Sequence, residues 1–185
     1  AKAFNRSVQR YIDSDEYMEI YPNTRLNSKN VVTVQSWLRN SEEYEIVNKK
    51  GSLKAVGVGG GLSGHPVDLA IIDDPIKDYK EAASEVVREA VWNWYVSVLS
   101  TRLHNDSKQI LIMTRWHADD LAGRLLNSAY SEDEFYTPWE VLSLPAILEQ
   151  LTEGDPRSVG EALWPNRHSL NKILSIKSQS ENIFN

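Results

Sequence analysis

Cysteine is absent from this 185-residue chain, which excludes disulfide bonds and thiolate metal sites and is typical of a cytosolic protein. No apolar run approaches the roughly 20 residues that span a membrane, and the first residues lack the apolar middle of a signal peptide, so we expect no membrane contact. A surplus of positive charge is also missing. The net charge of -6 argues against a protein that binds nucleic acid mainly by electrostatic attraction.

The remaining composition is ordinary for a globular protein, with 41% hydrophobic and 25% charged residues. A length of 185 residues fits one domain with a sizeable core, and we predict a single domain over residues 1–185. Buried strands are expected at 67–72, 108–114 and 139–144, and other strands at 31–37, 43–47 and 52–58. Helices are expected at about 1–12, 78–103, 119–127 and 169–179.

Buried strands that alternate with helices predict an α/β fold with a mostly parallel sheet flanked by helices. The segments 43–47 and 52–58 are separated by Asn-Lys-Lys-Gly and predict a small β-hairpin. Asp78, with Glu81 three residues later, is expected to cap the long helix.

The segment V-D-L-A-I-I-D-D-P, residues 67–75, is the most informative in the chain. Its almost unbroken apolar run predicts a strand buried on both faces, which Pro75 ends. Asp73 and Asp74 therefore lie where a strand leaves the sheet, the place where open α/β folds bind ligands. One carboxylate could hold a metal-bound water while the other orients a nucleophilic water. The alternative is a pair of solvated acids that begin a turn.

Thr114 and Arg115 follow the next predicted strand, 108–114, and are expected at the same edge of the sheet as Asp73. A hydroxyl group there can sense a γ-phosphate, and an arginine can stabilise phosphate charge by bidentate hydrogen bonds. The alternative is that Thr114 caps the next helix and that Arg115 pairs with Asp119 or Asp120.

The glycine-rich run 57–64 is not a phosphate-binding Walker A loop. It is followed by His65-Pro66 rather than by lysine and Ser/Thr, and it leads into a strand rather than a helix. We predict a strand-linking connection instead. The four histidines have no metal-ligand spacing, so no histidine zinc site is expected.

Several blocks closely resemble the large terminase subunit of tailed bacteriophages and prophages. They are G-V-G-G-G-L-S-G-H-P-V-D-L-A-I-I-D-D-P-I-K, then V-W-N-W-Y and T-R-L, then I-L-I-M-T-R-W-H-A-D-D-L-A-G-R-L, and finally L-P-A and L-W-P-N-R-H-S-L. The resemblance covers about residues 3–185. It implies a motor that hydrolyses ATP to move double-stranded DNA into an empty capsid, joined to a nuclease that cuts concatemeric DNA.

The resemblance also implies site residues on a P-loop-NTPase-like core of the ASCE type. Asp73 matches the Walker B aspartate that holds Mg²⁺, the metal that accompanies ATP. Asp74 stands at the catalytic carboxylate, which is usually glutamate in related ATPases. Thr114, with Arg115 beside it, matches the coupling motif.

The family's P-loop is expected upstream of Ala1 and its nuclease domain downstream of Asn185. Residues 1–185 would then be a partial ATPase domain that is inactive by itself. The implied partners are double-stranded DNA, the portal protein and the small terminase subunit, within a homo-oligomeric ring in the host cytoplasm. Arg102 is a candidate for the arginine finger that acts on a neighbouring subunit.

Two other interpretations remain open. A metal-dependent nuclease would use Asp73 and Asp74, with Asp119 and Asp120 as the nearest further carboxylates, because two-metal chemistry needs several converging acids. A non-enzymatic module for capsid and portal assembly would instead present an exposed apolar patch that includes Trp139 or Trp164.

Overall fold

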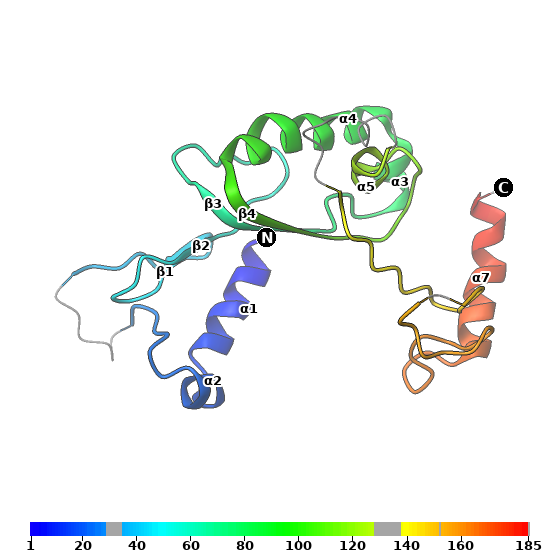
Figure 1. The fold of residues 1–185 in the computed structure, drawn as a ribbon, viewed down its shortest axis with the longest axis horizontal. Coiled ribbons are helices and arrows are strands. Elements are labelled where there is room, and N and C mark those ends of the chain that lie inside the picture. The colour runs from blue at the N-terminus through cyan, green and yellow to red at the C-terminus, as the bar shows by residue number, and fades with distance from the viewer. Residues whose placement is uncertain (29–34, 128–137, 152, 185) are drawn as a thin grey trace. The chain divides into compact units, whose positions relative to one another are not determined.

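The computed structural model describes residues 1–28, 35–127, 138–151 and 153–184, with side chains described up to residue 179. The chain is α/β, with small sheets and helices (Figure 1). Its contacts group into two compact units, Ala1–Tyr136 and Thr137–Asn185. The assignment of all 185 residues to one domain stays a prediction.

The first unit contains two small sheets and most of the helices. In chain order its elements are α1 (Lys2–Ile12), α2 (Asp15–Ile20), β1 (Glu43–Glu45), β2 (Ser52–Lys54), β3 (Val67–Asp73), α3 (Tyr79–Ala83), α4 (Glu85–Trp94), the π-helix η1 (Tyr95–Leu99), the 3₁₀ turn η2 (Ser100–Arg102), β4 (Leu103–Ile112) and α5 (Leu121–Leu125).

Strands β3 and β4 pair in parallel, and the helices α3 and α4 form the connection between them. Residues on one face of β3, Ala70 and Ile72, pack into a core with Val91, Tyr95 and Leu99 of the helical connection. The parallel pairing confirms the predicted α/β arrangement for these strands.

The prediction that residues 67–72 are buried on both faces is wrong. Leu69 and Ile71 are 51% and 55% exposed, whereas Ala70 and Ile72 between them are buried. Side chains alternate between the two faces of a strand, and residues of α3, α4, η1 and α5 pack on the Ala70–Ile72 face. Both faces of β3 are apolar, but only one of them is buried, so apolar composition alone did not predict burial.

Strand β4 begins and ends earlier than the predicted 108–114. Val67 pairs with Leu103, but Leu69 pairs with Lys108, so extra residues of β4 are accommodated by an irregularity. Ser107 stabilises it by donating a hydrogen bond from Oγ to the Val67 carbonyl oxygen at 2.5 Å. The polar residues 105–107, which lie between the predicted helix 78–103 and the predicted strand 108–114, are thus part of the strand.

The single helix predicted over 78–103 is divided at Ser84. Asp78 caps α3 as predicted, because its carboxylate accepts from the Glu81 amide at 2.9 Å. Ser84 then caps α4 by accepting from the Val87 amide at 3.5 Å, which begins a new helix. Serine competes for backbone hydrogen bonds in this way because its hydroxyl is close to its own main chain.

Helix α1 confirms the first predicted helix, but its buried face is largely polar. Asn5 and Gln9 are buried, and they donate to the carbonyl oxygens of Ser41 and Asn40 at 3.2 and 2.6 Å. The apolar Phe4 is 59% exposed. A loop needs partners for its buried carbonyls, and amide side chains supply them.

The predicted hairpin is confirmed by antiparallel pairing of β1 with β2, in which Tyr44 lies opposite Leu53. Asn48 adopts a positive φ of 58° in the connecting turn, as asparagine tolerates better than most residues. Of the strand predicted at 31–37, residues 31–34 lie outside the described residues, and residues 35–37 are not in a strand.

The second unit contains helix α7 (Leu170–Phe184), at which Ser169 Oγ accepts from the Lys172 amide at 3.4 Å. This confirms the predicted helix, which extends beyond residue 179. The strand predicted at 139–144 is wrong, because residues 139–144 are irregular and Leu142 is 83% exposed. Over the residues described in both units, no helix has both the length and the hydropathy needed to cross a membrane.

The alternating exposure of β3 gives a matched test of its two faces. Ile72→Ala should lower the free energy of unfolding by ~2–5 kcal/mol, because it removes buried methylene groups and leaves a cavity. Ile71→Ala on the open face should change it by about 0.5 kcal/mol or less. Urea denaturation of the 185-residue chain measures both, and equal losses would show that Ile71 is buried in solution.

Candidate functional site

The carboxyl end of the β3–β4 sheet brings together residues that are 40 positions apart in the chain. Asp73 pairs with Ile112 in the parallel register, so the segments that follow both strands leave the sheet at one edge. The Asp74 amide donates to the Ile112 carbonyl oxygen at 3.0 Å, and the Thr114 amide donates to Asp74 Oδ1 at 3.4 Å. Asp74 and Thr114 are therefore neighbours.

The backbone of Asp74 is in the left-handed region, with a φ of 41°. This conformation costs a non-glycine residue on the order of 1–2 kcal/mol, although aspartate tolerates it better than most residues. It occurs where the strand ends, and it turns the Asp74 side chain toward the Thr114 amide. Strained residues of this kind cluster at functional sites.

Asp73 and Asp74 are both exposed at this edge. The Asp73 carboxylate makes no hydrogen bond or ion pair with the residues that the structure describes. Its oxygens are therefore available to a cation or to water. Thr114 is also exposed, so its hydroxyl can reach a ligand at the same edge.

Arg115 follows the alternative interpretation of the sequence, in which it pairs with a nearby aspartate. Its Nε donates to Asp120 Oδ2 at 2.8 Å, and its Nη2 contacts the Ala118 carbonyl oxygen at 3.4 Å. Asp120 is fully buried and also caps α5 by accepting from the Gly123 amide at 2.8 Å. Arg115 itself stays 47% exposed, so part of its guanidinium faces solvent.

A glycine is required at position 123 to close this turn. A Cβ there would lie 1.8 Å from the Ala118 carbonyl oxygen and 3.0 Å from Arg115 Nη2. The tight packing keeps Arg115 and Asp120 within one short segment that follows Thr114.

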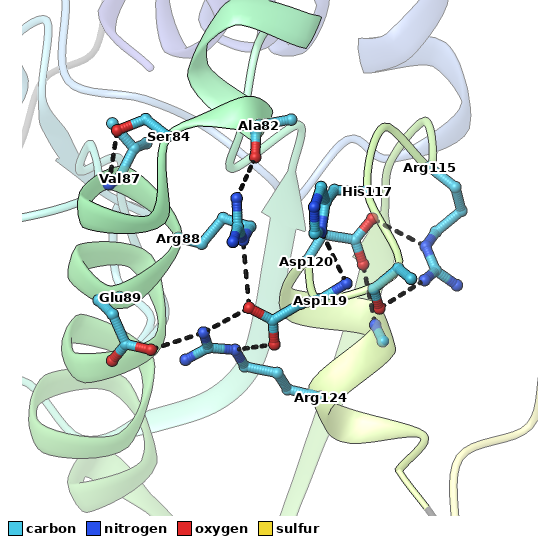
Figure 2. Close-up of polar contacts among 12 residues, drawn as sticks. Ala82, Ser84, Val87, Arg88, Glu89, Arg115, His117, Asp119, Asp120 and Arg124 are labelled. Carbon is cyan, nitrogen blue, oxygen red and sulfur yellow. Dashed lines mark hydrogen bonds and ion pairs between the residues drawn. The ribbon is translucent and has the colours of Figure 1, made fainter. Parts of the chain in front are cut away.

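Asp119 forms a second ion-pair network, which joins this segment to helix α4 (Figure 2). Its carboxylate accepts from Arg124 Nε and Nη2, each at 2.8 Å, and from Arg88 Nε at 3.1 Å. Arg124 also contacts Glu89 of α4 at 2.6 Å. Hydrogen bonding to Arg124, with a further contribution from Arg88, lowers the pKa of Asp119 to about 2 from its ordinary value of 3.8.

Sequence reasoning missed Arg88, Glu89 and Arg124 in this network. Arg124 lies five residues after Asp119, on the other side of the α5 cap, and no local pattern marks such a pair. Arg88 and Glu89 lie more than 30 residues away from their partners, and only the packing of α4 on α5 brings them close.

The glycine-rich run 57–64 connects β2 with β3, as predicted. Its Gly60 carbonyl oxygen accepts from Trp94 Nε1 at 2.9 Å, which fastens the run to α4. A Cβ on Gly60 would lie 2.9 Å from the Gly57 carbonyl oxygen, so this turn needs glycine there. The contact gives the run a structural role.

The nuclease interpretation receives no support from the geometry. Within the described parts of the chain, no group of three or more His, Cys, Asp or Glu side chains is placed to hold a metal ion. Asp119 and Asp120, its candidate carboxylates, are instead paired with arginines.

The residues suggested for assembly and for the arginine finger lie elsewhere. Trp164 is 59% exposed and lies against Arg167, whose Cζ is 5.5 Å from the ring centroid, whereas Trp139 is half-buried. Arg102 is in η2, and its buried Nε has no hydrogen-bond partner in the described structure.

A comparison with known protein families identifies the family of this chain. A family model described as the terminase large subunit, T4-like virus type, N-terminal, matches residues 2–177. Neither a search of curated proteins nor a search of solved structures finds a match.

The lowered pKa of Asp119 predicts a pH-dependent contribution to stability. Because the folded pKa is about 2 and the ordinary value is 3.8, the contribution should be complete above about pH 4 and should be lost as the pH falls toward 2. Asp119→Asn should therefore lower the free energy of unfolding at pH 6. The gap in this free energy between the variant and wild type should shrink between pH 4 and 2.

Urea denaturation at a series of pH values measures this difference. Asp106→Asn is the matched control, because Asp106 is exposed and its carboxylate pairs with none of the described residues. A difference for Asp119→Asn that stays constant down to pH 2 would contradict the assigned ion pairs.

Proposed function

This chain belongs to the T4-like type of terminase large subunits, and from that membership we propose that it forms part of the ATP-hydrolysing motor that packages phage DNA. The N-terminal match and the α/β fold support this proposal. In it, residues 67–74 act as the Walker B element of a P-loop-type core, and residues 114–115 act as the coupling motif.

The contact between Asp74 and Thr114 is the observation that carries the proposal. A motor of this class needs a carboxylate that orients the attacking water, and a neighbouring group that responds to the γ-phosphate. The Thr114 amide occupies Asp74 Oδ1, which leaves Oδ2 to accept a hydrogen bond from water. The Thr114 hydroxyl, exposed beside it, is the group that senses the phosphate.

Asp73 is proposed to hold Mg²⁺, and the exposure of its carboxylate supports this proposal. Mg²⁺ in nucleotide sites keeps several waters and binds one or two carboxylates together with substrate phosphates. Asp73 offers an exposed carboxylate without a partner among the described residues, next to the reacting edge. When bound, the metal would neutralise phosphate charge, while Asp74 and Thr114 orient water and phosphate.

Arg115 is proposed to stabilise phosphate charge with the part of its guanidinium that Asp120 does not occupy. Its Nε and Nη2 are engaged within its own segment, but Nη1 is not, and the side chain is 47% exposed. The pairing with Asp120 orients the side chain, so little conformational entropy is lost when it binds an anion.

The 185 residues contain no GxxxxGK[ST] sequence, so the phosphate-binding loop of a complete site would have to come from outside them. We propose that the working subunit supplies this loop and acts on double-stranded DNA in a homo-oligomeric ring in the host cytoplasm. The portal protein and the small terminase subunit are its proposed partners.

Replacement of Asp74 tests the catalytic assignment in the complete large subunit. A positioned base contributes typically ~10²–10⁴-fold to rate, so Asp74→Ala should reduce ATP hydrolysis by about that factor and abolish DNA packaging. Nucleotide affinity, measured by calorimetry, should change little.

Asp68→Asn is the matched control for Asp74→Ala. Asp68 lies on the same strand but at its other end, with a side chain that is 96% exposed. This variant should hydrolyse ATP like wild type. Hydrolysis by Asp74→Ala at the wild-type rate would refute the proposed catalytic role.

The 185-residue chain alone should bind Mg-ATP weakly and turn it over negligibly, because its sequence has no P-loop motif, whose lysine and backbone amides bind the phosphates. Isothermal calorimetry of the isolated chain with Mg-ATP measures the affinity. Saturable binding in the micromolar range would show that the site is complete without an added loop.

A further inference from the structure

The Asp119 network lies between the two segments that leave the proposed active edge. One segment follows Asp74 and leads through α3 into α4, while the other follows Thr114 and leads to α5. Asp119 belongs to the second segment, five residues after Thr114, and its partner Arg88 belongs to α4. Figure 2 shows the Asp119 carboxylate between the Arg88 and Arg124 guanidinium groups.

The network is strongly polar and partly removed from water. The side chains of Arg88 and Arg124 are only 10% and 15% exposed, and the Asp119 carboxylate contacts both. Two guanidinium groups that are largely desolvated need a shared counter-charge, because an unpaired buried charge is costly. Asp119 is therefore the residue that permits both arginines to lie at this place.

Arg88 extends the connection to the other segment. Its Nη1 donates to the Ala82 carbonyl oxygen at 2.6 Å, near the end of α3. The arginine thus joins the α3–α4 junction, downstream of Asp74, to Asp119, downstream of Thr114. The chain from Asp74 to α4, the Arg88–Asp119 contact and the chain from Asp119 back to Thr114 together form a closed loop.

The contact at the active edge is weak by comparison. The Thr114 amide lies 3.4 Å from Asp74 Oδ1, and both residues are exposed. The Asp74 amide is held by the Ile112 carbonyl oxygen at 3.0 Å, but beyond Ile112 this long hydrogen bond is weak support for the position of Thr114. The three charge-assisted hydrogen bonds to Asp119, at 2.8, 2.8 and 3.1 Å, are stronger and more directional.

We propose that Asp119 is a positioning residue for ATP hydrolysis, whose ion pairs with Arg88 and Arg124 hold Thr114 at its place beside Asp74. This inference rests on the proposed function. Asp119 is not proposed to contact the nucleotide. It is proposed to act on the position of the residues that do.

The test compares Asp119→Asn with Glu89→Gln in the complete large subunit. Both substitutions remove one carboxylate charge from the same network. Among the described residues Glu89 contacts only Arg124 on α5, ten residues after Thr114, whereas Asp119 is five residues after Thr114 and also contacts Arg88. Asp119→Asn should lower kcat by roughly 10-fold, within the ~10²-fold that misplacement of catalytic groups can cost. KM should be unchanged, and Glu89→Gln should keep the wild-type kcat.

Hydrogen exchange at the Thr114 amide provides a readout that does not depend on activity. In Asp119→Asn this amide should exchange faster than in wild type, because the segment is no longer held beside Asp74 Oδ1. In Glu89→Gln its exchange should be unchanged. Asp119→Glu keeps the charge and should restore part of kcat and part of the protection.

Wild-type kcat and wild-type exchange at Thr114 in Asp119→Asn would overturn the inference, and so would equal losses in Glu89→Gln. Failure of the proposed function is a different result, namely normal hydrolysis in Asp74→Ala. If Asp119→Asn does not fold, Arg88→Lys tests the same contact, because lysine keeps the charge but loses the planar fork. It too should lower kcat without changing KM.

Discussion

Parallel pairing of β3 with β4 is the constraint on which the rest of the site depends. Parallel strands in register end at the same edge, so residues that follow them meet although the chain separates them by a long helical connection. The pairing of Asp73 with Ile112 places Asp74 and Thr114 in hydrogen-bond contact. A shift of one residue in this register would move the side chains of one strand to the opposite face and would separate Asp74 from Thr114.

The packing of α4 and of η1, which continues it, supports this pairing on one face of the sheet. Ala70 and Ile72 bury their side chains against Val91 and Tyr95, and the Tyr95 hydroxyl donates to Gln109 Oε1 of β4 at 3.0 Å. The same helix carries Arg88 and Glu89 to the segment that follows β4. Helix α4 therefore packs on the sheet and also contacts the segment that follows β4.

The two pairs of adjacent aspartates, 73–74 and 119–120, differ in their surroundings. Asp119 and Asp120 are adjacent in sequence, yet each is paired with a different arginine, and Asp120 is buried at a helix cap. Asp73 and Asp74, also adjacent, lie exposed at the strand end and are not paired with arginines in the described structure. The pair without strong counter-charges is the one suited to a metal ion and water, which is why the proposed chemistry is assigned to it.

Local patterns in the sequence were sufficient for the elements whose structure depends on nearby residues. They predicted the hairpin of 43–47 and 52–58, whose strands are shorter in the structure, at 43–45 and 52–54. They also predicted the Asp78 cap, the strand that ends at Asp73 and the helix after Ser169, because caps, turns and apolar periodicity act over a few residues. They failed at residues 139–144, where an apolar run lies exposed, because apolar composition does not show whether another element covers it. The role of Arg115 was left open between phosphate and aspartate.

What the sequence determined by itself was the kind of residue at the end of each strand and, through its motifs, the family. Only the tertiary structure decided that Ile71 faces outward while Ile72 is buried, that Arg115 pairs with Asp120, and that Asp119 joins α4 to the segment after Thr114. These outcomes depend on contacts between residues that are distant in the chain. Such contacts exist only after the helices have packed on the sheet, and no local pattern encodes them.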